Sequence, residues 1–275
     1  MSPETLTTKK KKLITRLKAL QSVAVAFSGG VDSAFLAVMA RQVLGDRMVA
    51  LKAVSPMHSD REHRAALEFA AAFDLPLEVV TTDEMGVPGI AENPADRCYF
   101  CKQYLMGLMA DQAAKLGFAH IAHGANLDDL DDYRPGFKAA KEMDIKAPLI
   151  DAGLTKAEIR RLSQDMDLPT WNRPSMACLA SRIPYGTPLK KTVLETIARA
   201  EDLLYDLGLA ACRVRHHGNL ARIEIDPAEF PRLLTGPARE GLVDGLQALG
   251  YDHVCLDLEG YVQGSLNRAL EKQAT

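Results

Sequence analysis

Short apolar runs alternate with amphipathic stretches through the first half of this 275-residue chain. Apolar runs of this length are typical of strands buried on both faces, and helical periodicity is typical of segments that cover a sheet. The expected strands are Val23–Phe27, Met48–Val54, Leu77–Thr81 and His120–His123. The expected helices are Asp32–Leu44, Arg61–Phe73 and Tyr99–Lys115. This alternation predicts an α/β fold with a parallel, doubly wound sheet.

The pattern changes in the second half of the chain. Thr155 and Glu158 have the spacing of a capping box, which predicts a helix from there to about Met166. The stretch Asp167–Pro188 holds four prolines and is expected to be an ordered loop. The elements expected after it are a helix at Leu189–Leu207, strands at Ala211–His216 and Leu220–Ile225, two short helices, and a strand at Tyr251–Asp257.

These patterns predict two domains. Residues 1–170 should form the domain with the parallel sheet, and residues 171–275 a smaller α+β domain. Lys and Arg total 33 against 36 Asp and Glu, so the net charge of −3 gives no general basic surface for nucleic acid. No apolar run reaches the roughly 18 residues of a membrane span. Five cysteines in a chain too large to need disulfides favour a reducing compartment, so we expect a cytoplasmic protein.

A candidate phosphate-binding turn follows the first expected strand. Ser28, Gly29 and Gly30 lie between that strand and a helix, where glycines let backbone N–H groups approach phosphate oxygens. A mononucleotide P-loop would be longer and would carry a lysine. This turn carries Asp32 and Ser33 instead, which suits a loop that holds a departing pyrophosphate while Asp32 binds Mg²⁺. The alternative is an Asp that only stabilises a helix N-terminus.

Three cysteines form a second candidate site. Cys98 and Cys101 make a Cys-x-x-Cys pair, and Cys178 lies in the proline-rich stretch. They could hold an iron–sulfur cluster with one open iron, which could carry a sulfide. They could also hold a structural zinc with His120 or His123 as the fourth ligand, or be inert buried thiols.

Further polar residues extend the candidate sites. Asn126 and Asp128 follow a strand end, where α/β sheets bind ligands, although such residues also build simple turns. Arg213 and Arg215 alternate along one strand and so share a face, which suits a phosphate group or a solvated sheet surface. Ser181 and Arg182 follow Cys178 and could contact a substrate carboxylate or phosphate.

The turn "AFSGGVDS" resembles that of the PP-loop, or N-type ATP pyrophosphatase, superfamily. Together with the cysteines, the chain resembles the LarE family of ATP-dependent sulfur-inserting enzymes. The stretches that carry this resemblance are "RCYFCK", "HGANLDDLDDYRPG", "APLIDAGLTKAEIR", "LPTWNRPSMACLASRIPYGTP", "RVRHHGNLARIEI" and "LDLEGYVQGSLN".

The resemblance implies a reaction and its cofactors. ATP and Mg²⁺ adenylylate the carboxylates of pyridinium-3,5-biscarboxylic acid mononucleotide, and sulfur then displaces AMP to give a thiocarboxylate precursor of the nickel-pincer cofactor of lactate racemase. Cys98, Cys101 and Cys178 would hold a [4Fe-4S] cluster as sulfide carrier, with Cys178 as a sacrificial sulfur donor the alternative. The source of the sulfide or other sulfur donor stays open.

The resemblance also implies roles in the second domain. Arg213 and Arg215 would bind the phosphate of the nucleotide, and Glu201 and Glu224 would form an acidic metal site unless they are surface residues. The smaller domain would bind substrate and support a homo-oligomer. Val262 departs from the pattern, because an arginine is expected there.

Three other classes of protein compete with this interpretation. A tRNA thiolase shares the ATP loop and the cysteines but needs a basic RNA-binding surface. An ammonia-using ligase explains the loop but gives the cysteines no function. A non-catalytic nucleotide-binding module with a zinc site would release no pyrophosphate.

Overall fold

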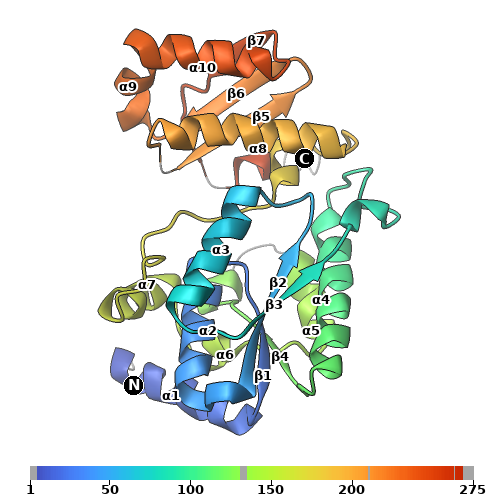
Figure 1. Cartoon of the computed structure of the whole chain (residues 1–275), viewed down its shortest axis with the longest axis vertical. Helices are drawn as coiled ribbons and strands as arrows, with labels where there is room; N and C mark the ends of the chain where they lie inside the picture. Colours follow the sequence, from blue (N-terminus) through green and yellow to red (C-terminus); the bar gives the residue numbers. More distant parts are fainter. Residues whose placement is uncertain (1–4, 131–134, 210, 263, 269–275) are drawn as a thin grey trace. The chain divides into compact units, whose positions relative to one another are not determined.

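The computed structural model describes residues 5–130, 135–209, 211–262 and 264–268 (Figure 1). The chain divides into two compact units. The first unit consists of Met1–Ser55, Glu62–Glu84 and Asp96–Ser175, and the second of Pro56–Arg61, Met85–Ala95 and Met176–Thr275. The division predicted at residue 170 and the roles expected for the smaller part stay predictions.

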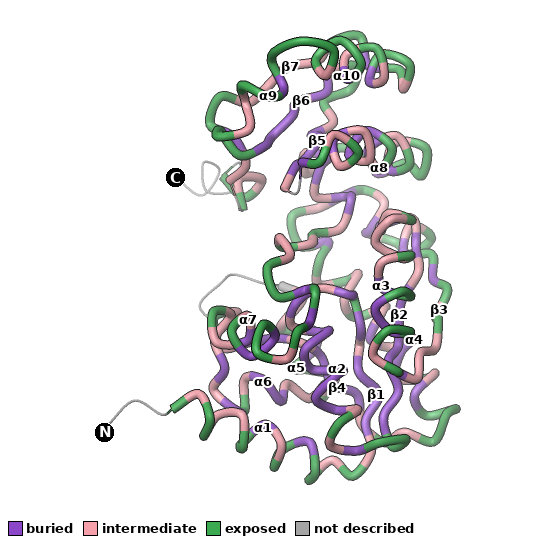
Figure 2. Tube along the Cα trace, turned by 60° about the vertical axis from the view of Figure 1, so that its left-hand side comes forward, coloured by how far each residue is buried: buried purple, intermediate pink, exposed green. Residues whose placement is uncertain are grey.

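A four-stranded, all-parallel sheet forms the centre of the first unit. The strand order is β3-β2-β1-β4. The strands are β1 (Val23–Ala26), β2 (Met48–Val54), β3 (Leu77–Thr81) and β4 (Ile121–His123). Each lies within one residue of its predicted bounds. β1, β2 and β4 are almost entirely buried, while the edge strand β3 is partly exposed (Figure 2).

Helices cover both faces of this sheet, which confirms the doubly wound prediction. Val25 and Ala50 belong to the apolar cluster that includes helices α2 and α3, whereas Ala24 and Leu51 belong to the cluster that includes α4. This alternation follows from the two-residue period of a strand. In chain order, the helices up to residue 165 are α1 (Leu6–Leu20), α2 (Val31–Leu44), α3 (Asp60–Ala72), α4 (Arg97–Lys115), α5 (Pro135–Glu142), α6 (Pro148–Asp151) and α7 (Lys156–Asp165).

The second unit has a three-stranded mixed sheet of order β5-β6-β7. β5 (Cys212–His217) pairs antiparallel with β6 (Leu220–Ile225), and β6 pairs parallel with β7 (His253–Leu256). Its helices are α8 (Lys191–Asp206), α9 (Phe230–Leu234) and α10 (Gly236–Ala248). The predicted α+β character is confirmed.

The proline-rich stretch is an ordered loop, as predicted. Among its described residues, the one helical segment is a 3₁₀ turn at Leu179–Arg182. The Asn93 side-chain amide donates hydrogen bonds to the carbonyls of Pro184 at 2.8 Å and Thr187 at 3.1 Å. Among the residues that the structure describes, no helix is long and apolar enough to cross a membrane.

Candidate functional site

The Ser28–Ser33 turn joins β1 to α2 and has the backbone of an anion-binding loop. Gly29 has φ +86°, and a Cβ added there would lie 3.0 Å from the Cβ of Ala66 on α3. Glycine is therefore required both by the backbone conformation and by the close approach of α3. Gly30 is the N-cap residue of α2, so no side-chain oxygen occupies the first N–H groups of the helix. These N–H groups and the helix dipole favour a phosphate.

The two serines of the turn hold its shape. The hydroxyls of Ser28 and Ser33 lie 2.9 Å apart. The Ser28 hydroxyl also accepts from Gly30 N–H at 3.3 Å, and the Ser33 hydroxyl accepts from Ser28 N–H at 3.2 Å. This network orders the loop without any contact to a ligand.

Asp32 lies in the first turn of α2 and meets side chains from two other segments. Its carboxylate forms an ion pair with the ammonium of Lys156, the first residue of α7. The Asn126 side-chain amide lies 3.4 Å from the other carboxylate oxygen of Asp32. The structure therefore brings together two of the predicted cofactor-binding residues, at the carboxyl end of β1 and β4, where ligands bind in α/β sheets.

Asn126 and Asp128 also build a turn, while their ligand-binding role stays a prediction. The Asn126 side-chain oxygen accepts from Asp128 N–H at 3.0 Å. The Asp128 carboxylate accepts from the backbone N–H of Lys156 at 2.9 Å, at the N-terminus of α7. Asp128 thus positions α7 and through it Lys156. Residues 131–134 of the same run lie outside the described residues.

Three residues of this site were not predicted from the sequence as site residues. Gly124 approaches α2 so closely that a Cβ would lie 2.7 Å from Ser33 N. Lys156 pairs with Asp32, as described above. The Arg173 guanidinium donates to the Gly29 carbonyl at 2.9 Å. The only signal for Lys156 was its place beside the capping box, since its partner is 124 residues away.

The cysteine pair lies at the N-terminus of α4, which begins at Arg97. Cys98 is exposed, whereas Cys101 and Cys178 are partly exposed, so the alternative of inert buried thiols is wrong. An Arg97 guanidinium nitrogen lies 4.0 Å from the Cys98 sulfur. A cation and a helix N-terminus both favour the thiolate that binds metals.

The cysteines belong to different units. Cys98 and Cys101 are in the first unit and Cys178 is in the second. Among the described residues, no group of three or more His, Cys, Asp or Glu side chains gathers in a way that could hold a metal ion. His120 and His123 therefore do not complete a zinc site with the pair. The three-cysteine cluster stays a prediction.

His123 ends β4 and is buried close to the cysteine helix. Burial, together with the charge of Lys102, lowers the pKa of His123 from 6.5 to about 4. The imidazole is therefore neutral at pH 7.

A buried arginine–glutamate pair connects the cysteine loop of the second unit to α8. Arg182 donates two hydrogen bonds of 2.8 Å to the Glu201 carboxylate, and both side chains are at most 5% exposed. The same guanidinium donates to the carbonyls of Ala177 at 2.6 Å and Cys178 at 3.1 Å. Arg182 thus fixes the backbone on which Cys178 lies. Glu201 also accepts from Val214 N–H at 3.1 Å.

A second buried carboxylate lies on β6. Glu224 is 1% exposed and accepts from Arg215 at 2.7 Å and from Arg222 at 3.1 Å. Arg215 also donates to the Ser181 carbonyl at 2.8 Å. The alternative that Glu201 and Glu224 are surface residues is therefore wrong, and so is a solvated face for Arg213 and Arg215, which are 4% and 6% exposed. Their predicted metal-binding and phosphate-binding roles stay predictions.

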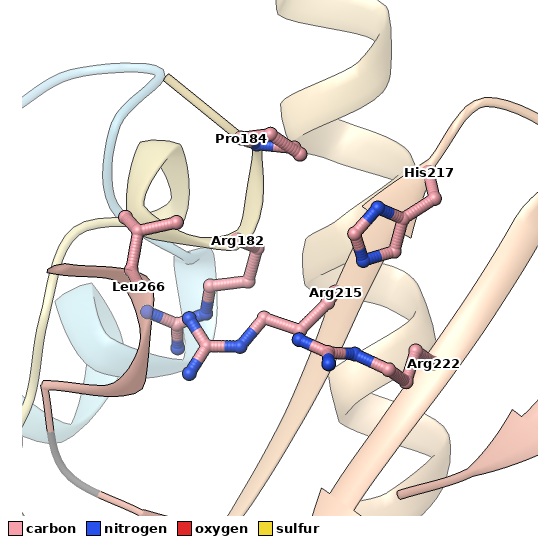
Figure 3. Close-up of a pocket in the computed structure, with 6 residues that line it drawn as sticks. All are labelled: Arg182, Pro184, Arg215, His217, Arg222 and Leu266. Atoms are coloured by element: carbon pink, nitrogen blue, oxygen red, sulfur yellow. The ribbon is translucent and has the colours of Figure 1, made fainter. Parts of the chain in front are cut away.

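The arginines of the second unit line a small pocket (Figure 3). The Nε atoms of Arg215 and Arg222 are buried and make no hydrogen bond. Burial and the charges of Arg222 and Arg215 lower the pKa of His217. Arg213 does not line this pocket, and its guanidinium lies 5.0 Å from the ring centre of Tyr261. The lining residues are Arg182, Pro184, Arg215, His217, Arg222 and Leu266.

The pocket has the chemistry of an anion site. The Nε–H groups of Arg215 and Arg222 can donate to a phosphate or carboxylate, while a terminal nitrogen of each guanidinium already donates to Glu224. A buried N–H donor without an acceptor is costly, so an anion that accepts from these two groups would remove that cost.

Comparison with known proteins places the chain beside a small group of relatives. Residues 5–87 match the NAD synthase family. An uncharacterized protein of Synechocystis is 42% identical over 92% of this chain and 94% of its own length. The pyridinium-3,5-bisthiocarboxylic acid mononucleotide synthase of Lactiplantibacillus plantarum is 37% identical over 98% of this chain and 97% of its own length. An uncharacterized protein of Methanocaldococcus jannaschii is 27% identical over 88% of the chain and 91% of its own length.

Proposed function

We propose that this chain inserts sulfur into a pyridinium mononucleotide. The chain is an enzyme and belongs to the LarE family, that of the pyridinium-3,5-bisthiocarboxylic acid mononucleotide synthase. The observation that carries the proposal is the match to that synthase over 98% of the chain. The pyrophosphate loop and the arginine pocket support it, since the reaction needs ATP and a substrate that bears phosphate and carboxylate groups.

The proposed reaction has two steps for each carboxylate of pyridinium-3,5-biscarboxylic acid mononucleotide. A carboxylate oxygen attacks the α-phosphorus of ATP, and the bond to the β-phosphate oxygen breaks to release pyrophosphate. A sulfur nucleophile then attacks the acyl carbon, and AMP leaves with the former carboxylate oxygen. Adenylylation is needed because AMP is a far better leaving group than an oxide ion. The product is the thiocarboxylate precursor of the nickel-pincer cofactor.

ATP would bind at the Ser28–Ser33 loop. The glycine backbone and the N-terminus of α2 fit a phosphate, and Ser33 and Ser28 can reorient their hydroxyls toward it. Asp32 fits Mg²⁺, because its carboxylate already faces a cation, Lys156. We expect Mg²⁺ to replace that ammonium at the carboxylate when ATP binds.

The substrate would use the second unit. Arg182 and Arg215 line the pocket and would contact a phosphate or carboxylate. Ser181, whose carbonyl accepts from Arg215, would lie beside that subsite, and the phosphate-binding role proposed for Arg213 would need contacts outside this pocket. Glu201 and Glu224 hold these arginines in place in this structure. Their proposed second role as Mg²⁺ ligands would require the arginines to release them.

The cysteines fit an iron–sulfur cluster in donor type. Cys98 is exposed and Cys101 and Cys178 are partly exposed, and Arg97 and the start of α4 would favour metal binding by Cys98. A [4Fe-4S] cluster with one open iron would supply a bound sulfide. The second candidate is the same reaction with Cys178 as a sacrificial donor, which the partial exposure of that thiol also allows. The cytoplasmic location and the homo-oligomeric state stay predictions.

Anaerobic purification tests the source of sulfur. We expect about four irons per chain and acid-labile sulfide in the wild type, and loss of both in Cys98→Ala. Cys255→Ala, which changes a cysteine outside the predicted set, serves as the control and should keep its iron. Iron-free wild-type protein that loses the mass of H₂S at Cys178 after turnover would favour the sacrificial donor.

The reaction itself is tested by pyrophosphate release. Release from ATP should depend on the pyridinium biscarboxylate mononucleotide, and mass spectrometry should show replacement of oxygen by sulfur in the product. Substrate-independent release, or sulfur insertion into tRNA alone, would contradict the proposal.

A further inference from the structure

One lysine of the first unit is almost fully buried in the sheet, where the carboxylate whose charge acts on it is that of Glu62. Lys52 lies on β2 and is 3% exposed. Among the described residues it makes no hydrogen bond and no ion pair within 4.0 Å. A buried ammonium is costly unless an anion neutralises it. The position therefore calls for a ligand that accepts from it.

The strand register places Lys52 at the level of the phosphate loop. Ala26 pairs with Leu51, and Phe27 N–H donates to the Leu51 carbonyl at 2.9 Å, so Lys52 lies beside the residue that precedes Ser28. Residues two apart on a strand share a face. Lys52 therefore faces the same side as Ala50, which belongs to the apolar cluster that includes α3.

Helix α3 connects Lys52 to the loop. Glu62 on α3 is the residue whose negative charge acts on Lys52. Ala66, four residues further, lies on the same side of that helix. Ala66 is also the residue against which Gly29 packs, since a Cβ on Gly29 would lie 3.0 Å from its Cβ. Gly29 packs against Ala66, and the charge of Glu62 acts on Lys52. The two residues therefore face neighbouring turns of α3, which lie about 6 Å apart along its axis.

The electrostatic balance at this position favours an anion. Burial lowers the pKa of Lys52, and the charge of Glu62 offsets this only in part. Lys156 differs, because its side chain is 33% exposed and its ammonium therefore carries a smaller desolvation cost than that of Lys52. A phosphate at the loop would be the first close acceptor for the Lys52 ammonium.

We propose that Lys52 binds the phosphates of ATP and supplies to the Ser28–Ser33 loop the cation that a P-loop carries as its own lysine. Lys52 is then a catalytic residue that stabilises the negative charge of the departing pyrophosphate. This inference rests on the proposed use of ATP by this enzyme.

Calorimetric titration with Mg·ATP tests the inference. Lys52→Met keeps the length of the side chain and removes its charge, so ATP should bind about 10- to 100-fold more weakly, as for the loss of a charged hydrogen bond. Lys115→Met removes a lysine exposed on α4 and should bind ATP as the wild type does. Unchanged ATP affinity in Lys52→Met would overturn the inference.

Thermal unfolding separates binding from a structural role. Without ATP, Lys52→Met should melt at or above the wild-type temperature, because an unpartnered buried charge is gone. The rise in melting temperature with ATP should shrink. A variant that melts lower but keeps the full ATP-induced rise would show a structural role and overturn the inference. Lys52→Gln provides the same test if Lys52→Met does not fold.

The inference and the proposed function can fail separately. Wild-type protein that binds ATP through Lys52 but releases no pyrophosphate with the pyridinium substrate would contradict the proposed function alone. Substrate-dependent pyrophosphate release with unchanged ATP affinity in Lys52→Met would contradict the Lys52 inference alone.

Discussion

At the scale of single residues, the second unit depends on charges that are buried in pairs. The guanidinium of Arg182 is 2% exposed and meets the Glu201 carboxylate with two hydrogen bonds. Such a pair contributes little net stability, but either member alone is an uncompensated buried charge. The pair also holds the carbonyls next to Cys178, so it links the position of a reactive sulfur to a salt bridge.

We predict that Arg182→Met lowers the free energy of unfolding by about 3–5 kcal/mol, because Glu201 is left buried and unpaired. Urea unfolding measures this. Arg161→Met is the matched control, since Arg161 pairs with Asp165 on the surface at 3.1 Å and such pairs contribute about 0.5 kcal/mol. An equal loss of unfolding free energy in the two variants would contradict the role of Arg182 as the buried partner of Glu201. Arg182→Met/Glu201→Leu should recover most of the loss.

At the scale of elements, the ends of strands and the starts of helices form the candidate site around the Ser28–Ser33 loop. The capping box of Thr155 and Glu158 fixes the start of α7, and the next residue is Lys156, whose ammonium meets Asp32 at the start of α2. β4 ends at His123, and Gly124 then approaches α2 closely. These short connections bring groups from distant parts of the chain to one edge of the sheet.

His123, at the end of β4, makes the stability of the fold depend on pH. The pKa of His123 is about 4 in the folded chain against 6.5 ordinarily, so the unfolded chain binds more protons between these values. The stability from neutral His123 is present at pH 7 and is lost as the pH falls from 6.5 toward 4, by about 3 kcal/mol in all.

Urea unfolding at pH 7 and pH 5 measures that loss. His123→Asn should lose less stability than the wild type between the two pH values. His253→Asn, at an exposed position of β7, should keep the wild-type pH dependence. If His123→Asn lost as much as the wild type, His123 would not be the group responsible.

At the scale of the whole molecule, charge separates the proposed enzyme from its nearest rival. The chain has 33 Lys and Arg against 36 Asp and Glu. Arg182, Arg215 and Arg222 pair with carboxylates, which leaves less positive charge for a nucleic acid. A tRNA thiolase needs a basic surface, because contacts to phosphates dominate such binding.

A gel-shift titration with tRNA tests this difference. We expect tRNA not to bind at about 0.1 M salt or when the salt concentration is lowered. The pyridinium mononucleotide should bind in the same buffer. Tight, salt-dependent tRNA binding would favour the thiolase. Arg222→Gln serves as a comparison, since loss of a pocket arginine should weaken mononucleotide binding without affecting tRNA.

The sequence by itself determined the four parallel strands, the loop and the family, whereas helices α5 and α6 were not predicted. Periodicity gave the four parallel strands within one residue, because a strand buried on both faces must be continuously apolar. The Ser-Gly-Gly-x-Asp-Ser turn was readable because local backbone geometry restricts which residues can stand there. Cys98, Cys101 and Cys178 were recognisable by residue type, since few other residues serve sulfur chemistry.

Tertiary structure alone decided which charges meet. Lys156 and Asp32 are 124 residues apart, and no local pattern marks them as partners. Arg182 was predicted to contact substrate, and Arg215 to bind a phosphate or face solvent, and only the structure paired them with Glu201 and Glu224. Lys52 lies in a strand that the sequence predicted, and only the tertiary structure showed that its side chain is buried. Electrostatic partners depend on distance in space, which the fold sets and the sequence order does not.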